Sequence, residues 1–361
     1  MIQLFEEYFK ETIISNRREL FDAINLISPL LPDGWGVSNP LPGNKIMCYV
    51  PLKARKEAYK EFTIPKKSGG VRKISAPVAS LKIIQSTINI LLQSVFTPSD
   101  YATGFVIGKS VKDNALTHVG QLCIFNMDLE NFFPSITKRM VRKALHRELG
   151  HVLASNDVIN IICSLCTQPN SEGIEVLPQG APTSPVLSNI VLKSFDFDMA
   201  DLARKAGLRY SRYADDITFS HSNLIRRMSP FWIQQIHKVV NKYGLKINDA
   251  KTKEQPLGTR QEVTGVIVSN RINVPRQYLK NLRTLLHLWE KYGYEQAQSI
   301  YTKDFCKGKV KNLSSVIDGK INYLEMLKGR GDSTYRKLKY RHKKLLRIEK
   351  LKAQQNKEQR R

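Results

Sequence analysis

The stretch RYADDITFS, residues 212–220, decides the fold of this chain, because two adjacent aspartates interrupt a segment that otherwise predicts a pair of strands. Neighbouring carboxylates repel one another, and burying either of them without a partner is costly. A chain that places Asp215 and Asp216 there needs a compensating positive charge beside them. The segment therefore predicts a functional site rather than a plain hairpin.

The charge balance of the chain points to a polyanionic partner. Its 361 residues include 57 lysines and arginines against 32 aspartates and glutamates, a formal net charge of +25. Such an excess creates a broad positive field, and nucleic acid is the first candidate partner. Hydrophobic residues make up 42% and charged residues 25%, which is ordinary for a globular protein large enough for two or three subdomains.

Three features predict a cytoplasmic protein. No apolar run has the length needed to span a membrane, and the start MIQLFEEYFKET does not resemble a signal peptide. Five cysteines without a regular framework are typical of a reducing compartment. Cys163 and Cys166 form a CxxC, but no second ligand pair accompanies them, which favours core packing over a zinc or redox site.

Periodicity and turn residues divide the chain into helices and short strands. Helices are expected over residues 1–35, 81–96, 132–149, 185–207 and 230–243, followed by a basic helical region from about residue 276. A central strand is expected over 122–129, hairpins over 62–77 and 210–222, and strand-like runs over 245–252 and 262–270. This order predicts an α+β fold in which helices cover an antiparallel sheet.

The end of the chain, residues 335–361, is almost wholly cationic between its leucines and isoleucines. A solvated tail is one interpretation of such a run. The favoured interpretation is a helix that lies along phosphates, with Leu338, Leu345 and Leu346 docking one face while lysines and arginines point outward.

A third aspartate, Asp128, stands in the apolar strand LCIFNMDL at 122–129. An unpaired carboxylate is not tolerated there, so we expect this strand to lie beside the hairpin that carries Asp215 and Asp216. Three clustered carboxylates do not all ionise unless cations compensate them. Two Mg²⁺ ions, with Mn²⁺ as the alternative, would do so and would stabilise the attacking and leaving oxygens of a phosphoryl transfer.

Several long segments resemble the motifs of a reverse transcriptase. YADD (213–216), MDLENFFPSI (127–136) and LPQGAPTSPVLSN (177–189) resemble three central motifs of the palm. FTIPKKSGGVRKISAP (62–77) resembles the fingers segment that contacts the incoming nucleotide, and YGLKINDAKT (243–252) resembles the palm motif that follows the catalytic hairpin. The similarity runs in order from about residue 60 to residue 270.

Two short segments indicate the branch of that family. NALTH (114–118) and VTG (263–265) resemble the NAxxH and VTG signatures of retron reverse transcriptases, and both fall where that family has them. The resemblance implies a right-hand polymerase with fingers, an antiparallel palm and a helical, basic thumb. No endonuclease or RNase H segment is apparent, as in retron enzymes. The implied divisions are an N-terminal helical element at 1–50, fingers at 51–120 and 137–176, palm at 121–136 and 177–270, and thumb at 271–361.

The resemblance also implies the catalytic residues. Asp128, Asp215 and Asp216 would hold the metal ions, with the backbone carbonyl of Leu129 as an additional ligand. Lys251 resembles the lysine that protonates the pyrophosphate leaving group, a role that requires reach and a proton.

Nucleotide selection would depend on a second group of residues. Phe132 or Phe133 would close on the sugar and exclude a 2′-hydroxyl, which selects dNTPs, although core packing is the alternative for each. Arg72, with Lys66 or Lys67, would reach the triphosphate, because arginine offers a fork and lysine a point charge to phosphate.

Gln179 and Gly180 open the LPQGAPTSP loop, where prolines stiffen the chain and the glycine lets the backbone approach a ligand closely. They would lie beneath the nascent base pair. A plain entry into a helix that starts at Ser184 and Pro185 is the alternative, and both can hold at once.

The retron signatures supply the candidate RNA contacts. Asn114 and His118 are spaced i,i+4, on one face of an expected helix, and would position the structured RNA or the priming end. Packing is the alternative for a lone histidine. Val263, Thr264 and Gly265 would contact the primer side, although a plain sheet would also suit Val263.

The function implied is RNA-templated DNA synthesis by a retron. The enzyme would extend DNA from the 2′-hydroxyl of an internal guanosine of its partner noncoding RNA, which serves as template and primer. The product would be branched multicopy single-stranded DNA, an RNA–DNA hybrid made from dNTPs. The implied partners are that RNA, the hybrid product and an accessory effector protein that acts in defence against phage, with no membrane.

Two rival functions remain open at the level of the sequence. One is another bacterial reverse transcriptase, of the group II intron or abortive-infection type; the missing maturase and DNA-binding extensions disfavour the intron enzyme. The other is an RNA-binding scaffold with an idle polymerase site, which the presence of Asp128, Asp215 and Asp216 disfavours.

Overall fold

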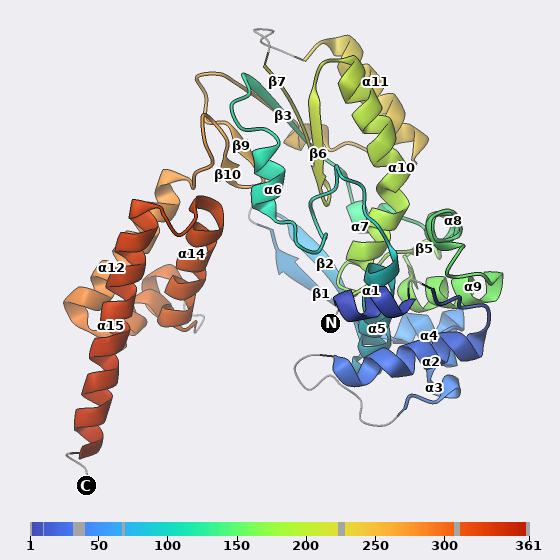
Figure 1. Ribbon diagram of the computed structural model, residues 1–361, viewed down its shortest axis with the longest axis horizontal. Helices are drawn as coiled ribbons and strands as arrows, with labels where there is room; N and C mark the ends of the chain where they lie inside the picture. Colours follow the sequence, from blue (N-terminus) through green and yellow to red (C-terminus); the bar gives the residue numbers. More distant parts are fainter. Residues whose placement is uncertain are drawn as a thin grey trace. The chain divides into compact units, whose positions relative to one another are not determined.

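The computed structural model describes residues 2–9, 11–31, 40–66, 69–222, 228–306 and 311–358, so the candidate Lys67 lies outside the described residues. The chain forms two compact units (Figure 1). The first contains residues 1–110 and 125–254, and the second contains residues 111–124 and 255–361. Each unit has a hydrophobic core of its own. The finer division into fingers, palm and thumb stays a prediction.

A four-stranded sheet of order β6-β7-β3-β8 supports the candidate catalytic residues. Its strands are β3 (Cys123–Asp128), β6 (Arg209–Tyr213), β7 (Asp216–His221) and β8 (Lys253–Pro256). β6 and β7 form the antiparallel hairpin expected from the sequence, with Tyr213 opposite Asp216. β3 is the expected apolar strand, and it lies next to β7 as the paired aspartates require.

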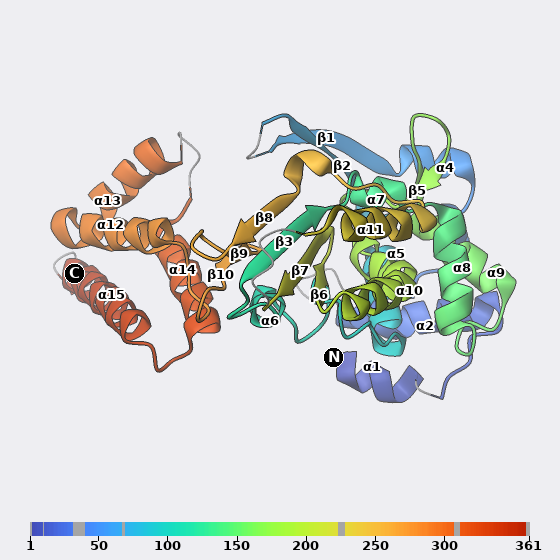
Figure 2. The same ribbon diagram turned by 90° about the horizontal axis from the view of Figure 1, so that it is seen from above.

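Helices make up most of the rest of the first unit, and the fold is α+β as predicted. They are α1 (Ile2–Phe9), α2 (Arg17–Ile27), a 3₁₀ turn (Ser28–Leu30), α3 (Gly43–Met47), α4 (Leu52–Glu57), α5 (Ala79–Val95), α7 (Phe132–Ser135), α8 (Lys138–Leu149), α9 (Asn156–Cys166), α10 (Ser184–Lys205) and α11 (Pro230–Lys242). α10 packs against β6 and against α11 (Figure 2). The N-terminal helices α1 and α2 pack on α5, so the N-terminal element belongs to the first unit.

Local sequence signals explain where several helices begin. The side chain of Asn16 accepts a hydrogen bond from the Glu19 amide at the start of α2, and Ser155 caps α9 through its own side chain. α10 begins at Ser184 with Pro185 in its first turn, as expected, because proline there loses no helical hydrogen bond.

Two small hairpins complete the first unit. β1 (Tyr59–Pro65) and β2 (Val71–Pro77) form the hairpin predicted over 62–77, with Ile64 opposite Arg72. β4 (Gln168–Pro169) pairs with β5 (Glu175–Val176). The backbone amide of Ser75 in β2 donates to the carbonyl of Gln179, which fixes the LPQG loop against the first hairpin.

The second unit combines a short helix, a hairpin and a group of helices. Its elements are α6 (Val111–Leu116), β9 (Glu262–Val263), β10 (Val266–Ile267), α12 (Arg276–Tyr292), α13 (Tyr294–Ile300), a π-helical turn (Tyr301–Phe305), α14 (Leu313–Lys328) and α15 (Ser333–Glu358). β9 and β10 are joined by Thr264 and Gly265, both at positive φ. The basic end of the chain forms the helix α15, as expected.

Three local expectations are wrong. The run 245–252 is not a strand: Ile247 makes a single bridge to Leu129, and the chain then turns in a 3₁₀ helix (Asp249–Lys251). His118 lies in a turn after α6 rather than on the helix. Leu338 and Leu345 are buried in α15, but Leu346 is 36% exposed and does not dock.

The CxxC pair lies in the core, as the packing interpretation expects. Cys163 and Cys166 are fully buried free thiols. Burial raises the pKa of each thiol to about 12, which keeps them protonated and inert.

Candidate active site

The turn of the β6–β7 hairpin positions the two adjacent aspartates. Ala214 and Asp215 form a two-residue loop, and Asp216 is the first residue of β7. Ala214 has a φ of 57°, in the left-handed region that costs a non-glycine residue about 1–2 kcal/mol. Strain of this kind persists only where the surroundings hold it in place, and it is common at functional sites.

Backbone hydrogen bonds bring Asp128 to the same place. The amide of Leu129 donates to the carbonyl of Asp215 at 3.0 Å, which joins the end of β3 to the turn. On the other side, the amide of Asn248 donates to the carbonyl of Asp128 at 2.8 Å. Three segments far apart in the sequence, 127–130, 213–216 and 245–251, therefore meet at one point.

The two adjacent aspartates of the turn have raised pKa values. Burial raises the pKa of Asp215, and the charge of Asp128 raises it further. Burial, followed by the charges of Asp215 and Asp128, raises the pKa of Asp216 to about 7. The carboxylates therefore form a concentrated negative site that favours a cation.

Lys251 already supplies one positive charge to this site. Its Nζ donates to Oδ2 of Asp128 at 2.7 Å, while the Asp128 side chain is only 12% exposed. The hydrogen bond to Asp128 is the largest cause of a raised pKa at Lys251, so the lysine is protonated at neutral pH. The 3₁₀ turn at 249–251 directs this side chain back to the end of β3.

The site suits a hard divalent cation in its donor chemistry. Carboxylate oxygens are the ligands that Mg²⁺ prefers, and a protonated amine stands against one of them here. Within the described part of the chain, no three His, Cys, Asp or Glu side chains are grouped as a finished metal site. The metal roles of Asp128, Leu129, Asp215 and Asp216 stay a prediction.

Asp128 and Asp215 line a cleft of about 1320 Å³ within the first unit, whereas Asp216 is not among the residues that line it. Most of the predicted nucleotide-site residues line this cleft together with the catalytic candidates: Lys66, Arg72, Asp128, Leu129, Phe132, Phe133, Gln179, Asp215 and Lys251. Phe132 is 6% exposed and belongs to the core, whereas Phe133 is only partly buried. Phe133 is therefore the more accessible of the two phenylalanines.

The walls of the cleft are built from the first hairpin and the LPQG loop. Arg72 is exposed on β2, and its charge lowers the pKa of Asp215, although burial and Asp128 outweigh it. Gly180 has a φ of 136°, and a β-carbon there would lie 2.9 Å from the carbonyl oxygen of Ser75. Glycine is thus required for the loop to approach β2 so closely.

Comparison with known proteins identifies the family. The family described as reverse transcriptase (RNA-dependent DNA polymerase) matches residues 64–268, more than half of the chain. The reverse transcriptase of retron Ec83 from Escherichia coli is 34% identical over 216 residues, which cover 59% of this chain and 69% of that protein. The chain belongs to the retron reverse transcriptases. Its α+β fold is the right-hand polymerase fold expected of that family.

Two relatives from Myxococcus xanthus extend the comparison. The retron Mx65 reverse transcriptase is 37% identical over 243 residues, which cover 63% of this chain and 55% of that protein. The retron Mx162 reverse transcriptase is 32% identical over 253 residues, which cover 63% and 52%. The chain thus spans about half the length of these relatives. Among solved structures, telomerase from Candida albicans with a fragment of telomeric RNA has a TM-score of 0.42 at 11% identity, covering 80% of this chain and 63% of that one.

The NALTH and VTG segments meet in the second unit of this reverse transcriptase. Nδ2 of Asn114 donates to Oγ1 of Thr264 at 2.9 Å, and Asn114 and His118 are both fully buried. Val263 is fully buried in the same core, while Thr264 and Gly265 adopt φ values of 47° and 81°. NALTH and VTG therefore lie in one local structure, and their predicted RNA contacts stay a prediction.

Sequence reasoning missed the segment that lies behind the YADD turn. Gly104 is so close to the turn that a β-carbon on it would lie 2.4 Å from the Ala214 amide nitrogen. Phe105, at a φ of 60°, lines the cleft with its ring 6.1 Å from that of Phe133. The only signal for this segment was a glycine beside an aromatic residue, a pair too common to single out.

Proposed function

We propose that this retron reverse transcriptase is an RNA-directed DNA polymerase that copies a partner noncoding RNA. The RNA serves as template and primer, and DNA grows from the 2′-hydroxyl of an internal guanosine to give branched multicopy single-stranded DNA. One observation carries the proposal: Asp128, Asp215 and Lys251 converge on a cleft that also carries the nucleotide-site candidates. Membership in the retron family supports the choice of RNA.

The catalytic roles follow from the charges at the cleft. Asp128, Asp215 and Asp216 would hold two Mg²⁺ ions, or Mn²⁺ in their place, with the Leu129 carbonyl beside them. Bound there, the ions would activate the attacking hydroxyl and neutralise the triphosphate. Lys251 would release Asp128 and give its proton to the pyrophosphate, and its raised pKa means that it holds that proton at neutral pH.

The nucleotide roles follow from exposure and charge. Phe133 would be the residue that excludes a ribose 2′-hydroxyl, because Phe132 is buried and Phe133 is the more accessible of the two. Arg72 and Lys66 are both exposed along the cleft and would contact the triphosphate. Gln179 and Gly180 would lie under the new base pair.

The second unit would bind the RNA. Asn114, His118 and the turn at Val263–Gly265 would position the RNA stem or the priming end, since Asn114 donates a hydrogen bond to Thr264 and joins the two segments. The basic helix α15 would lie along the phosphates of the RNA and of the growing duplex, with the 271–361 region acting as thumb.

The biological setting is proposed from the family. The enzyme would work in the cytoplasm with an accessory effector protein, in defence against phage. Among the described residues, no helix is both long enough and apolar enough to cross a membrane.

The decisive test is to purify the protein from its native operon and to analyse the nucleic acid that accompanies it, before and after RNase and debranching enzyme. A short DNA of fixed length, joined to RNA until it is debranched, is expected from the wild type and not from Asp215→Ala. Polymerisation on a supplied template without a branched product would indicate another branch of bacterial reverse transcriptases. Bound RNA without any polymerisation would indicate a scaffold.

A further inference from the structure

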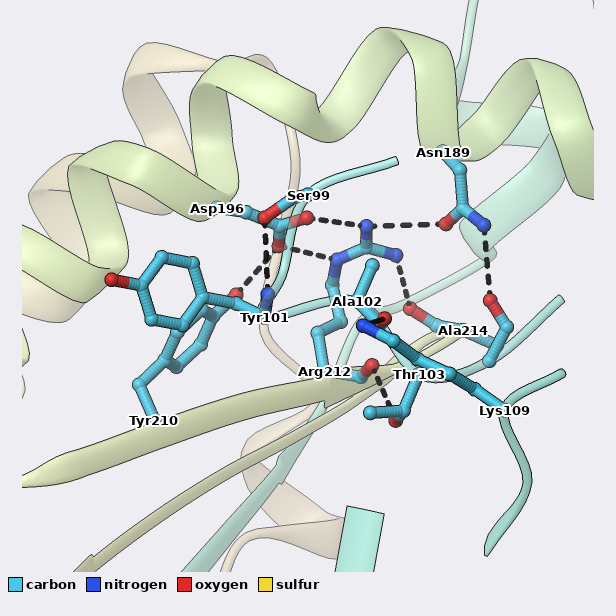
Figure 3. Close-up of polar contacts among 11 residues, drawn as sticks. Ser99, Tyr101, Ala102, Thr103, Lys109, Asn189, Asp196, Tyr210, Arg212 and Ala214 are labelled. Carbon is cyan, nitrogen blue, oxygen red and sulfur yellow. Dashed lines mark hydrogen bonds and ion pairs between the residues drawn. The ribbon is translucent and has the colours of Figure 1, made fainter. Parts of the chain in front are cut away.

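A fully buried ion pair lies behind the YADD turn (Figure 3). Arg212, in β6, and Asp196, in α10, are both 0% exposed. The arginine donates from Nε to Oδ1 and from Nη2 to Oδ2, both at 2.7 Å, which is the bidentate arrangement of guanidinium and carboxylate. The hydroxyl of Tyr210 donates to the same carboxylate at 2.9 Å.

Arg212 also donates to the turn and to a second residue of α10. Its Nη1 donates to the carbonyl of Ala214 at 3.1 Å, and its Nη2 also donates to Oδ1 of Asn189 at 3.2 Å. Asn189 in turn donates to the carbonyl of Gly104 at 3.0 Å. Figure 3 shows the guanidinium between Asp196, Asn189 and Ala214.

The backbone of Arg212 is also held by hydrogen bonds. The amide of Arg212 donates to the carbonyl of Tyr101 at 2.9 Å, and the amide of Thr103 donates to the carbonyl of Arg212 at 2.8 Å. Gly104 then lies directly against the amide nitrogen of Ala214. The turn is therefore enclosed by the 101–104 segment and by the guanidinium.

Stability alone gives little reason for this arrangement. A buried ion pair is often no more stabilising than well-packed apolar residues of similar volume, because desolvation of two charges offsets their attraction. What apolar residues could not provide is the hydrogen bond to the Ala214 carbonyl. That bond orients the peptide that leads into Asp215, while the Leu129 amide holds the Asp215 carbonyl on the other side.

We propose that Arg212 is a positioning residue for the catalytic turn: it fixes the Ala214–Asp215 peptide and thereby the direction of the Asp215 carboxylate. Asp196 and Asn189 hold the guanidinium at the angle that this requires. The catalytic consequence rests on the proposed polymerase function. The structural part of the proposal, that Arg212 holds residues 213–216 in place, does not depend on the polymerase function.

Two variants test the proposal. The combined replacement Arg212→Met, Asp196→Leu and Tyr210→Phe removes both charges and keeps the site apolar and filled. Arg212→Lys keeps the charge but replaces a five-donor fork by a point donor. Tyr210→Phe alone is the matched control, because it removes one hydrogen bond of the same network and leaves the contact to Ala214 intact.

The assays are primer extension on a supplied RNA template, with kcat and KM for dNTP measured separately, and amide hydrogen exchange of the peptide that contains residues 213–216. Misplacing a reacting group by about 1 Å can cost about 100-fold. Both test variants are expected to lower kcat by at least about tenfold at unchanged KM and unchanged duplex affinity, and to exchange faster at 213–216. Tyr210→Phe should match the wild type in both assays.

The outcomes distinguish the positioning role of Arg212 from the proposed polymerase function. If the wild type does not polymerise, the proposed function fails, and hydrogen exchange still decides whether Arg212 holds the turn. If either folded test variant keeps wild-type kcat and wild-type exchange at 213–216, the positioning role is overturned.

Loss of the fold in one variant does not leave the positioning role undecided. If Arg212→Lys fails to fold, the apolar triple variant decides the question; if the triple variant fails to fold, Arg212→Lys decides it. If both lose their fold while Tyr210→Phe does not, the ion pair is structural and the proposal is overturned.

Discussion

Replacing Gly104 by alanine is the most direct challenge to the geometry of the YADD turn. The added β-carbon would lie 2.4 Å from the Ala214 amide nitrogen and 2.9 Å from the Tyr213 carbonyl carbon. Both neighbours are backbone atoms, so no flexible side chain can move aside. To reach an ordinary contact distance of 3.4 Å, the turn or the 102–105 segment has to move about 1 Å.

The size of that movement determines the expected losses of stability and of kcat. Overpacking of a well-packed interior costs about 1–3 kcal/mol of unfolding free energy. A displacement of about 1 Å at the reacting groups costs up to about 100-fold in kcat. We therefore expect Gly104→Ala to unfold a few degrees below the wild type and to lose most of its kcat in primer extension, with little change in KM for dNTP.

A matched glycine makes the test specific. Gly319 lies within α14, and a β-carbon there would meet nothing within 4 Å. Gly319→Ala should therefore keep full activity and gain up to about 1 kcal/mol of stability from helix propensity. If Gly104→Ala were as active and as stable as the wild type, the close contact with the Ala214 amide would be refuted.

Four further predictions concern the site and the retron signatures. Phe133→Ala should raise incorporation of rNTPs relative to dNTPs, measured by competition in primer extension; unchanged selectivity would exclude Phe133 as the sugar gate. Lys251→Met should lower kcat by about 100-fold or more with little change in KM, as expected for loss of a general acid, and full activity would remove it from that role. The pKa of Asp216 is raised from its usual 3.8 to about 7, so the folded, metal-free protein holds a proton that the unfolded chain releases, and the contribution of Asp216 to stability should fall as pH rises from about 4 to about 7. Asp216→Asn should remove this contribution, so the difference between the unfolding temperatures of wild type and variant with EDTA should change over that pH range; parallel profiles for the two proteins would contradict it. A double-mutant cycle of Asn114→Ala and Thr264→Val should give a coupling of about 1 kcal/mol in unfolding free energy, whereas strict additivity would mean that their hydrogen bond contributes nothing.

The parts of the fold that the sequence predicted correctly are those with a local physical signal. Alternation and turn residues indicated the β6–β7 hairpin, and a carboxylate in an apolar strand indicated that Asp128 lies near it. The strand expected over 245–252 was wrong, because its apolar spacing continues only as far as Ile247. There the chain bonds once to Leu129 and turns, which brings Lys251 to Asp128.

The buried ion pair behind the YADD turn could not be predicted from the sequence, for a different reason. Arg212 is one cation among many in a chain with a net charge of +25, and nothing in its neighbours marks it as buried. Its partner Asp196 stands in another element, sixteen positions earlier. Only the packing of α10 against β6 brings the two together. Pairings of this kind depend on tertiary structure and leave no periodic trace.

The second unit is built from two separate stretches of the sequence, which has a consequence for folding during synthesis on the ribosome. Residues 111–124, which carry α6, leave the ribosome long before residues 255–361, the rest of the same core. All residues of the first unit are available once residue 254 has emerged. The 111–124 segment therefore emerges before the residues that it packs against, and a protein cut short after residue 254 would keep Asp128, Asp215 and Asp216 while leaving Ala115 and Ile124 without their packing partners. Truncation of the C-terminal helices is thus expected to yield aggregation before it yields a clean polymerase core.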